Sequence, residues 1–220
     1  MKTYDDETVE KIIESYLEDK KTTLCCLMSK GGKDVIRKEL EEENVTVEDG
    51  ELIENAVKIS DYDFLYRLRA FREGKCYVQD ESSMLCAKLA GAKEGQFVMD
   101  LCSAPGGKSL YTADQMKGSG QVLSRDLTEY KTDLIEDNIE RMGFTNMEAE
   151  VFDATILDEE HIEAADVVIA DVPCSGLGIM GKKNDIKYHI SEDGMKDLVK
   201  LQREILTNLS LIHISEPTRH

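Results

Sequence analysis

The chain has 220 residues and a formal net charge of −18, with 41% hydrophobic and 33% charged residues. This composition is typical of a folded protein with one domain, or one small and one medium domain, and excludes a disordered chain. No apolar run is long enough to cross a membrane, the N-terminus lacks a signal-peptide pattern, and the six cysteines form no C-x-x-C pair. We therefore expect a cytoplasmic protein without membrane contact and without metal.

Residues 1–75 have the pattern of a small α+β module. The expected elements, in chain order, are an amphipathic helix (6–20), a strand (22–28), a charged helix (34–43) and two strands (45–47 and 56–59). A polar stretch around Gly74 separates this module from the remainder of the chain.

From residue 82 onward, short apolar runs alternate with helical patterns. The expected elements are helices at 82–89, 109–116, 129–142 and 191–209, and strands at 96–101, 121–124, 148–152 and 166–170. Such alternation predicts an α/β fold with a parallel, doubly wound sheet. Ligands of such sheets bind at the carboxyl ends of the strands, where the loops that follow each strand lie together.

A Gly-rich turn, Ala104-Pro105-Gly106-Gly107-Lys108, follows the first strand of this sheet. Small residues there allow a ligand to approach the backbone, and a helix N-terminus follows directly. Gly107-Lys108-Ser109 is similar to the end of a phosphate-binding loop, but that motif needs a glycine where Cys102 stands, and no G-x-G-x-x-G is present. The turn therefore predicts a cofactor site that is neither a nucleoside triphosphate site nor a dinucleotide site.

Three acidic residues follow three later strands of the expected sheet: Asp126, Asp153 and Asp171. Asp126 is placed to accept hydrogen bonds from ribose hydroxyls, and Asp153 is placed to meet an adenine edge. An acid at a strand end is often only a helix cap, which is the alternative explanation for each. Three such acids around one Gly-rich turn favour a shared binding site.

The net charge argues against a nucleic-acid partner, because such binding relies on Lys and Arg that neutralise phosphates. Two local concentrations of basic residues oppose this argument, although a solvated surface explains either of them equally well. They are Arg67, Arg69, Arg72 and Lys75 before the Gly-rich turn, and Lys182, Lys183 and Lys187 near the end.

Three runs of sequence together resemble the Sun-type (RsmB-like) 16S ribosomal RNA cytosine-5 methyltransferases: YVQDESSMLCA, DLCSAPGGKS and DVPCSGLG. The resemblance extends over roughly residues 5–210. It implies a class I methyltransferase (Rossmann-like) fold, S-adenosylmethionine as cofactor and ribosomal RNA as partner. The implied cofactor-binding residues are Cys102, Ser103, Ala104, Pro105, Gly106, Gly107, Lys108, Asp126, Asp153 and Asp171.

Methylation at carbon 5 of cytosine requires activation of the ring, because carbon 5 alone is a poor nucleophile. A thiolate that adds to carbon 6 provides this activation. Judged from the residues alone, Cys174 in the Asp171-Val172-Pro173-Cys174 turn is the candidate nucleophile, with Asp171 and Lys108 as further catalytic contacts. The resemblance instead implies that a later Thr-Cys motif supplies the nucleophile and that Cys174 assists product release. No cysteine follows Cys174 in this chain.

The resemblance also implies that the chain is a fragment. We expect residues 76–210 to form an incomplete methyltransferase core, and residues 211–220 to be a non-native tail, with a natural short tail as the alternative. The module of residues 1–75 corresponds to one that helps to hold RNA, although Leu24-Cys25-Cys26-Leu27 lacks the Arg and Asn usual there. The alternatives for function are a tRNA cytosine-5 methyltransferase, or a non-catalytic remnant that binds RNA or cofactor.

Overall fold

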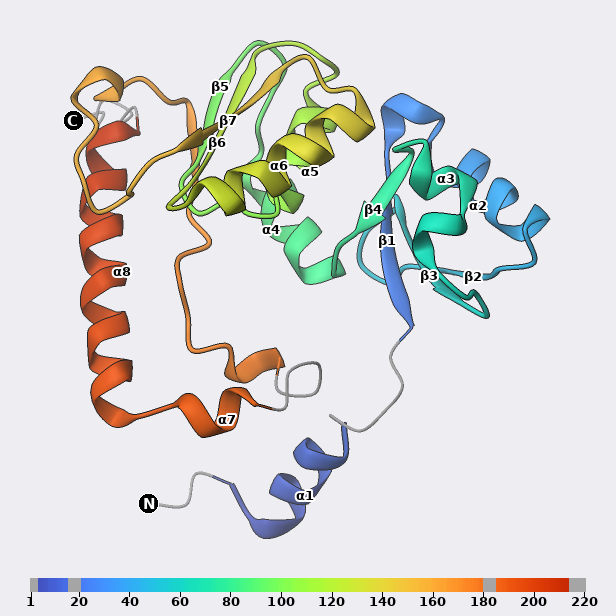
Figure 1. The fold of residues 1–220 in the computed structure, drawn as a ribbon, viewed down its shortest axis with the longest axis horizontal. Helices are drawn as coiled ribbons and strands as arrows, with labels where there is room; N and C mark the ends of the chain where they lie inside the picture. The colour runs from blue at the N-terminus through green and yellow to red at the C-terminus, as the bar shows by residue number, and fades with distance from the viewer. Residues whose placement is uncertain (1–3, 16–20, 180–184, 214–220) are drawn as a thin grey trace, which may run out of the picture. The chain divides into compact units, whose positions relative to one another are not determined.

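The computed structural model describes residues 4–15, 21–179 and 185–213 (Figure 1). The backbone forms two compact units: Lys21–Val172 together with Glu204–His220, and Met1–Lys20 together with Pro173–Arg203. Among the described residues, no helix is both long enough and apolar enough to cross a membrane.

The larger unit begins with a four-stranded antiparallel sheet in the order β2-β3-β1-β4. Its strands are β1 (Thr22–Cys26), β2 (Thr46–Asp49), β3 (Ala56–Ser60) and β4 (Cys76–Val78). Its helices are α2 (Gly32–Glu42) and α3 (Arg69–Arg72), with single 3-10 turns at Met28–Lys30 and Leu65–Arg67. An apolar core that includes Leu24, Ile36 and Phe71 lies between this sheet and its helices.

A second sheet follows, with four parallel strands in the order β7-β6-β5-β8. The strands are β5 (Phe97–Asp100), β6 (Gln121–Asp126), β7 (Met147–Val151) and β8 (Val167–Ile169). The helices between them are α4 (Glu81–Ala90), which precedes β5, α5 (Gly107–Gln115) and α6 (Glu129–Met142). The order places β5 in the middle of the sheet, so that the turn after it lies centrally at the carboxyl edge. This confirms the prediction of a Rossmann-like α/β fold.

Direct contacts join the two sheets within the larger unit. The Asp114 carboxylate of α5 accepts hydrogen bonds from the backbone N–H groups of Met28 and Ser29, at 2.7 and 3.0 Å. Arg141 at the end of α6 donates to the carbonyl oxygens of Phe71 (2.7 Å) and Cys76 (3.2 Å). One hydrophobic cluster contains residues of both sheets, with Cys25 and Tyr77 from the first and Val98 and Val122 from the second.

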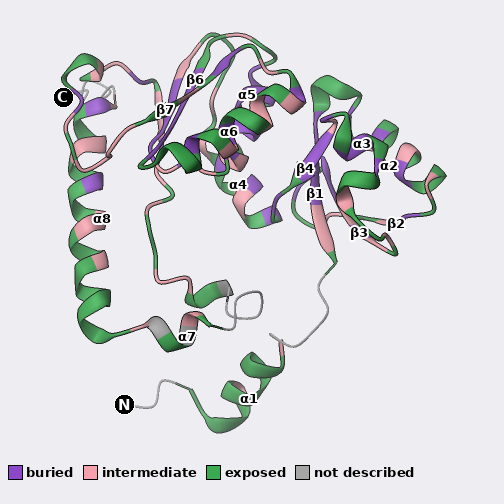
Figure 2. Ribbon diagram, in the orientation of Figure 1, coloured by how far each residue is buried: buried purple, intermediate pink, exposed green. Residues whose placement is uncertain are grey.

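Three α-helical segments lie among the described residues of the smaller unit. They are α1 (Asp6–Ser15), α7 (Ile186–His189) and the first part of α8 (Glu192–Ile212). None of the residues of α1 is buried, although its apolar residues have helical spacing (Figure 2). A 3-10 turn at Leu177–Ile179 precedes α7. From Glu204 onward α8 belongs to the larger unit, where Ile205 and Ile212 are buried.

All the predicted elements are observed in the predicted order and type, with differences at their ends, whereas α3, β4 and α7 were not predicted. The first sheet continues past residue 75, because Cys76–Val78 pairs with β1. The last helix does not end at 209 but continues to Ile212, and His213 forms a parallel bridge with Ala165. The first helix is seen only as Asp6–Ser15. Residues 16–20 and 214–220, which include most of the expected tail, lie outside the described residues.

Candidate functional site

The Gly-rich turn connects the central strand β5 to the start of α5. Gly106 has φ +98°, and a Cβ atom added to it would lie 3.3 Å from Ile135 of α6. The Gly106 N–H donates to the Ser103 carbonyl oxygen at 2.7 Å, and the Ser103 N–H donates to the Arg125 carbonyl oxygen at 2.8 Å. The Ala104–Pro105 peptide bond is cis. Both the backbone conformation and the lack of space at position 106 therefore favour glycine. The hydrogen bond to Arg125 holds the turn against β6.

A buried polar group lies beneath this turn. The Asp100 carboxylate at the end of β5 accepts a hydrogen bond from the Ser109 hydroxyl at 2.8 Å, and that hydroxyl lies 2.9 Å from Ser103 Oγ. Burial raises the pKa of Asp100 to about 6, although the serine hydroxyls and the charge of Lys108 oppose this shift. Asp100 and Ser109 therefore connect the two ends of the turn through their side chains.

Asp126, at the carboxyl end of β6, faces the same turn. Its Oδ2 accepts a hydrogen bond from the Ala104 N–H at 2.9 Å. Its Oδ1 accepts from the Leu127 N–H and from Lys131 Nζ, both at 2.8 Å. The structure thus brings together Asp126 and the Gly-rich turn, as the sequence predicted. Since a carboxylate can accept about four hydrogen bonds, these three donors leave capacity for one more on Oδ2.

Asp153 lies two residues beyond the end of β7. Its Oδ1 accepts hydrogen bonds from the Thr155 N–H (2.9 Å) and the Thr155 hydroxyl (2.7 Å). These local contacts are those of an Asx turn, a structural role that differs from the helix cap considered as the alternative. Among the described residues, no donor is hydrogen-bonded to the other carboxylate oxygen.

Lys108 and Asp171 form an ion pair at the carboxyl edge, although 63 residues separate them in the chain. Lys108 Nζ donates to Asp171 Oδ2 at 2.6 Å, with 15% of the lysine side chain and 65% of the aspartate side chain exposed. The pair joins the first turn of α5 to the loop that follows β8. A charged pair with one exposed partner remains available to a ligand.

The two cysteines of the predicted site differ in their surroundings. Cys102 is half-buried, and burial, with the nearby Asp126 charge as a smaller contribution, raises the pKa of its thiol to about 11. A thiol with such a pKa remains protonated near neutral pH and is a poor nucleophile. Cys174 is exposed and belongs to the smaller unit. Of the two, only Cys174 has the accessibility that a reactive thiol needs.

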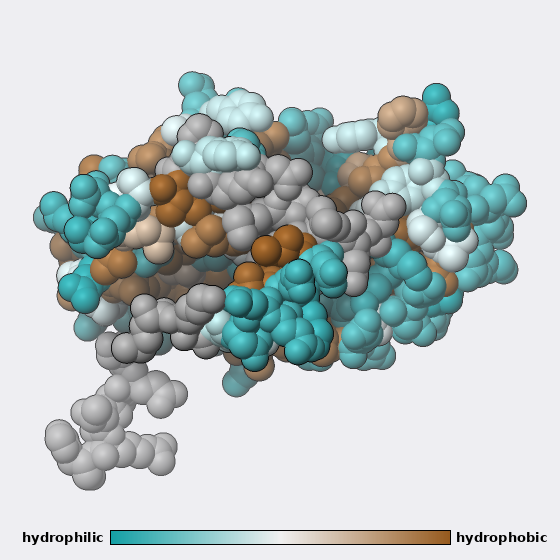
Figure 3. Space-filling model, turned by 90° about the horizontal axis from the view of Figure 1, so that it is seen from below, coloured by the Kyte–Doolittle hydropathy of each residue, from teal (hydrophilic) through white to brown (hydrophobic). Residues whose placement is uncertain are grey.

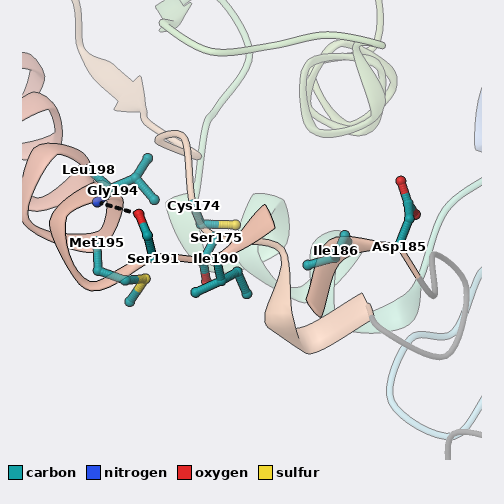
Figure 4. Close-up of a pocket in the computed structure, with 9 residues that line it drawn as sticks. All are labelled: Cys174, Ser175, Asp185, Ile186, Ile190, Ser191, Gly194, Met195 and Leu198. Carbon is teal, nitrogen blue, oxygen red and sulfur yellow. Dashed lines mark hydrogen bonds between the residues drawn. The ribbon is translucent and has the colours of Figure 1, made fainter. Parts of the chain in front are cut away.

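Cys174 lies at a cavity of about 270 Å³ within the smaller unit (Figure 4). The other side chains around this cavity come from the adjacent turn, from α7 and from the start of α8: Ser175, Asp185, Ile186, Ile190, Ser191, Met195 and Leu198, with Gly194. The Gly194 N–H donates to Ser191 Oγ at 3.1 Å, and Gln202 Nε2 donates to the Pro173 carbonyl oxygen at 2.7 Å. The thiol thus lies in a partly apolar pocket large enough for a small planar ring.

Most basic residues of the first predicted cluster pair with acids of the chain itself. Arg67 lies 3.1 Å from Asp63, Arg69 lies 3.6 Å from Glu42, and Lys75 lies 2.7 Å from Glu39. Their charges are therefore largely balanced within the module. Lys182 and Lys183 lie outside the described residues, as does the side chain of Lys187.

Several residues around the turn were not predicted from the sequence. Asp100 and Ser109 lie beneath it, Gln79 lies against Gly107, and two side chains of α6 contact its other side. Those two are Lys131, on Asp126, and Asn138, whose Nδ2 donates to the Pro105 carbonyl oxygen at 3.0 Å. Their seven-residue spacing, which places both on one helix face, was the available signal.

Comparison with known proteins agrees with this geometry. A family model described as 16S rRNA methyltransferase RsmB/F matches residues 87–214, more than half of the chain. The chain is 36% identical over 208 residues to the "Probable ribosomal RNA small subunit methyltransferase B" of Bacillus subtilis, covering 94% of this chain and 46% of that relative. It is 32% identical over 146 residues to the ribosomal RNA small subunit methyltransferase F of Klebsiella pneumoniae, covering 66% of this chain and 30% of that relative. The chain thus spans less than half the length of these relatives.

Two solved structures have the same fold over 94% of this chain. One is the crystal structure of PH0851, with a TM-score of 0.89, 28% identity and 47% of that chain covered. The other is NSun6 from Pyrococcus horikoshii, solved with SFG, with a TM-score of 0.85, 17% identity and 77% of that chain covered.

Proposed function

We propose, from the premise that the chain belongs to the RsmB/F family of 16S rRNA methyltransferases, that it contributes to methylation of a cytosine at carbon 5 in ribosomal RNA. S-adenosylmethionine is the proposed methyl donor. The observation that carries this proposal is the convergence of the Gly-rich turn, the Asp126 carboxylate and the Lys108–Asp171 pair at one edge of the sheet. The names of the relatives favour ribosomal RNA over tRNA as the substrate.

The residues present fit an S-adenosyl compound. Asp126 Oδ2 has capacity for one further hydrogen bond, which a ribose hydroxyl can donate. The first turn of α5 begins at Gly107, and its free N–H groups favour a carboxylate. The absence of side chains at Gly106 and Gly107 allows a ligand to approach the backbone. Asp153 and Asp171 are the proposed contacts of the adenine and of the ammonium group.

When bound, the donor supplies an electrophilic methyl group. The cytosine ring has to be activated before it can accept this group. In the proposed chemistry, a cysteine thiolate forms a bond to carbon 6, which makes carbon 5 nucleophilic. After carbon 5 has been methylated, its proton is transferred to a base, and the sulfur–carbon bond breaks as the ring double bond re-forms. We assign Cys174 to this release step. We assign Lys108 and Asp171 to the orientation of the cytosine ring.

We also assign one part of the proposed enzyme to each of the two sheets. The first sheet and its helices, ending at Val78, constitute the α+β module, and the second sheet constitutes the methyltransferase core. Leu24, Cys25, Cys26 and Leu27 of the module are buried at 0–1% exposure, so these side chains belong to hydrophobic cores and not to an RNA surface.

Calorimetry tests the cofactor assignment. We expect the chain to bind S-adenosylhomocysteine and not ATP. Asp126→Ala should weaken this binding at least about tenfold, because a hydrogen bond to a charged group contributes roughly 1.5–3 kcal/mol. Asp137→Ala, an exposed acid on α6, is the matched control and should bind normally. Tight binding of ATP, or equal affinity of the Asp126→Ala variant and the control, would refute the assignment.

A further inference from the structure

Two side chains at the end of β4 contact the Gly-rich turn. The Tyr77 hydroxyl donates to the Gly107 carbonyl oxygen at 3.2 Å. Gln79 Nε2 lies 3.1 Å from the position that a Cβ atom of residue 107 would occupy. Alternate residues of an extended segment point to the same side, so Tyr77 and Gln79 share a side. Val78 between them is 51% exposed.

These two residues belong to the first sheet, whereas the turn belongs to the second. Tyr77 is paired with Cys25 of β1, and the Gln79 N–H donates to the Thr23 carbonyl oxygen at 3.1 Å. Immediately after Gln79, the Glu81 carboxylate accepts hydrogen bonds from the backbone of Leu52 (2.6 Å) and Ile53 (3.1 Å). The segment that supports the turn is therefore fixed to the first sheet on both sides of Gln79.

Glutamine is a costly residue at position 79. Its side chain is 7% exposed, and Oε1 is buried without a hydrogen-bond partner among the described residues. An unpaired buried amide oxygen lowers stability, and an apolar side chain of similar length would avoid this cost. The nearest atoms to the vacant Cβ position of Gly107 are all from the Gln79 side chain, so the amide lies against the turn, which gives it a use other than stability. The missing Cβ of Gly107 provides the space for this contact.

We infer that Tyr77 and Gln79 are positioning residues for the methyl donor, through which the N-terminal module determines the shape of the donor-binding turn. This inference rests on the proposed function, since it assumes that the turn binds an S-adenosyl compound. It assigns to the N-terminal module a part in cofactor binding in addition to any contact with RNA.

Substitution at position 79 separates positioning from stability. We expect Gln79→Met to bind S-adenosylhomocysteine about tenfold more weakly, a difference of about 1.4 kcal/mol, because the turn loses the amide that lies against it, while its urea midpoint is unchanged or higher. Tyr77→Phe, which removes only the hydroxyl, should weaken binding in the same direction. Val78→Ala, on the opposite side of the same segment, should bind as the wild type does. Normal affinity in Gln79→Met overturns the inference. If Gln79→Met does not fold, normal affinity in Tyr77→Phe overturns the inference instead.

A double-mutant cycle tests the contact itself. Gly107→Ala should weaken binding, because its new Cβ would press on the Gln79 amide. If this contact is the reason, Gln79→Ala removes the obstacle, and the combined variant loses less affinity than the sum of the two single losses. Additive losses would show that the two residues act independently and would overturn the inference. Failure of the wild-type chain to bind S-adenosylhomocysteine would instead refute the proposed function.

Discussion

Asp100 is the residue whose environment departs most from what its sequence position indicated. The Gly-rich turn and Asp126 could be predicted, because turn glycines and strand-end acids are local signals. Asp100 ends β5 and appears equivalent to any strand residue until the fold places two serine hydroxyls beside it. Gln79 was hidden for a similar reason, since its contact with Gly107 depends on the pairing of β4 with β1. Both contacts are set by tertiary structure.

The first prediction concerns the pH dependence that Asp100 imposes. Burial raises the pKa of Asp100 from 3.8 to about 6, so the folded state binds its proton more readily than the unfolded state. The resulting loss of stability develops as the pH rises from 4 to 6 and is complete above that range. Asp100→Asn removes it, and the free energy of unfolding at pH 7.5 should rise by up to about 3 kcal/mol.

Urea denaturation of the wild type and Asp100→Asn at pH 5, 6 and 7.5 measures this effect. The difference between them should shrink as the pH falls toward 5. The exposed acid Asp137 supplies the control, since Asp137→Asn should show no such trend. A lower stability of Asp100→Asn at pH 7.5 would mean that the ionised carboxylate contributes more through its hydrogen bonds than burial costs.

At the scale of secondary structure, the parallel strands and their helices could be predicted, because continuous apolar runs and helical periodicity are properties of each segment alone. The predicted ends of these elements were less accurate than their order and type. Residues 76–78 were not expected to be a strand, since three residues carry little pattern and their pairing with β1 bridges some 50 residues of sequence. The end of α8 was placed too early, because its last turn is stabilised by burial of Ile212 and by contacts with the loop before β8.

The junction between the two sheets yields a prediction about an element end. Gly74, before β4, has φ +65°, and an added Cβ would lie 2.0 Å from the Arg141 carbonyl oxygen at the end of α6. Gly74→Ala should therefore lower the free energy of unfolding by about 2–5 kcal/mol, which combines backbone strain with overpacking.

Gly118→Ala is the matched control for this substitution. Gly118 has φ +74°, but no atom lies within 4 Å of its added Cβ. Gly118→Ala should therefore lower the free energy of unfolding only by the backbone strain, about 1–2 kcal/mol. Equal losses in the two variants would show that the close approach of α6 to residue 74 does not contribute to stability. Thermal and urea denaturation of both variants measures the difference.

For the whole molecule, 45 acidic residues face 27 basic ones, so pairing within the chain neutralises the cations and leaves an excess of acid. The net charge is −18, and the basic residues near the first sheet are paired with neighbouring acids. Figure 3 shows hydrophilic residues over much of one face, with hydrophobic residues exposed between them. Because most cations of this cluster already have acidic partners, they have less charge available for a polyanion.

The last prediction concerns catalysis by the 220-residue chain. The proposed chemistry uses one thiol for attack on carbon 6 and a second for release, and no cysteine follows Cys174 in these residues. Cys102 is unsuited to attack because burial raises the pKa of its thiol to about 11. We therefore expect the chain to bind S-adenosylhomocysteine and yet to form neither 5-methylcytosine nor a covalent adduct with unmodified 16S ribosomal RNA. Nucleoside mass spectrometry and a denaturing gel with labelled RNA measure these two outcomes. An adduct that disappears in Cys174→Ala would identify Cys174 as the nucleophile and reverse the role assigned to it.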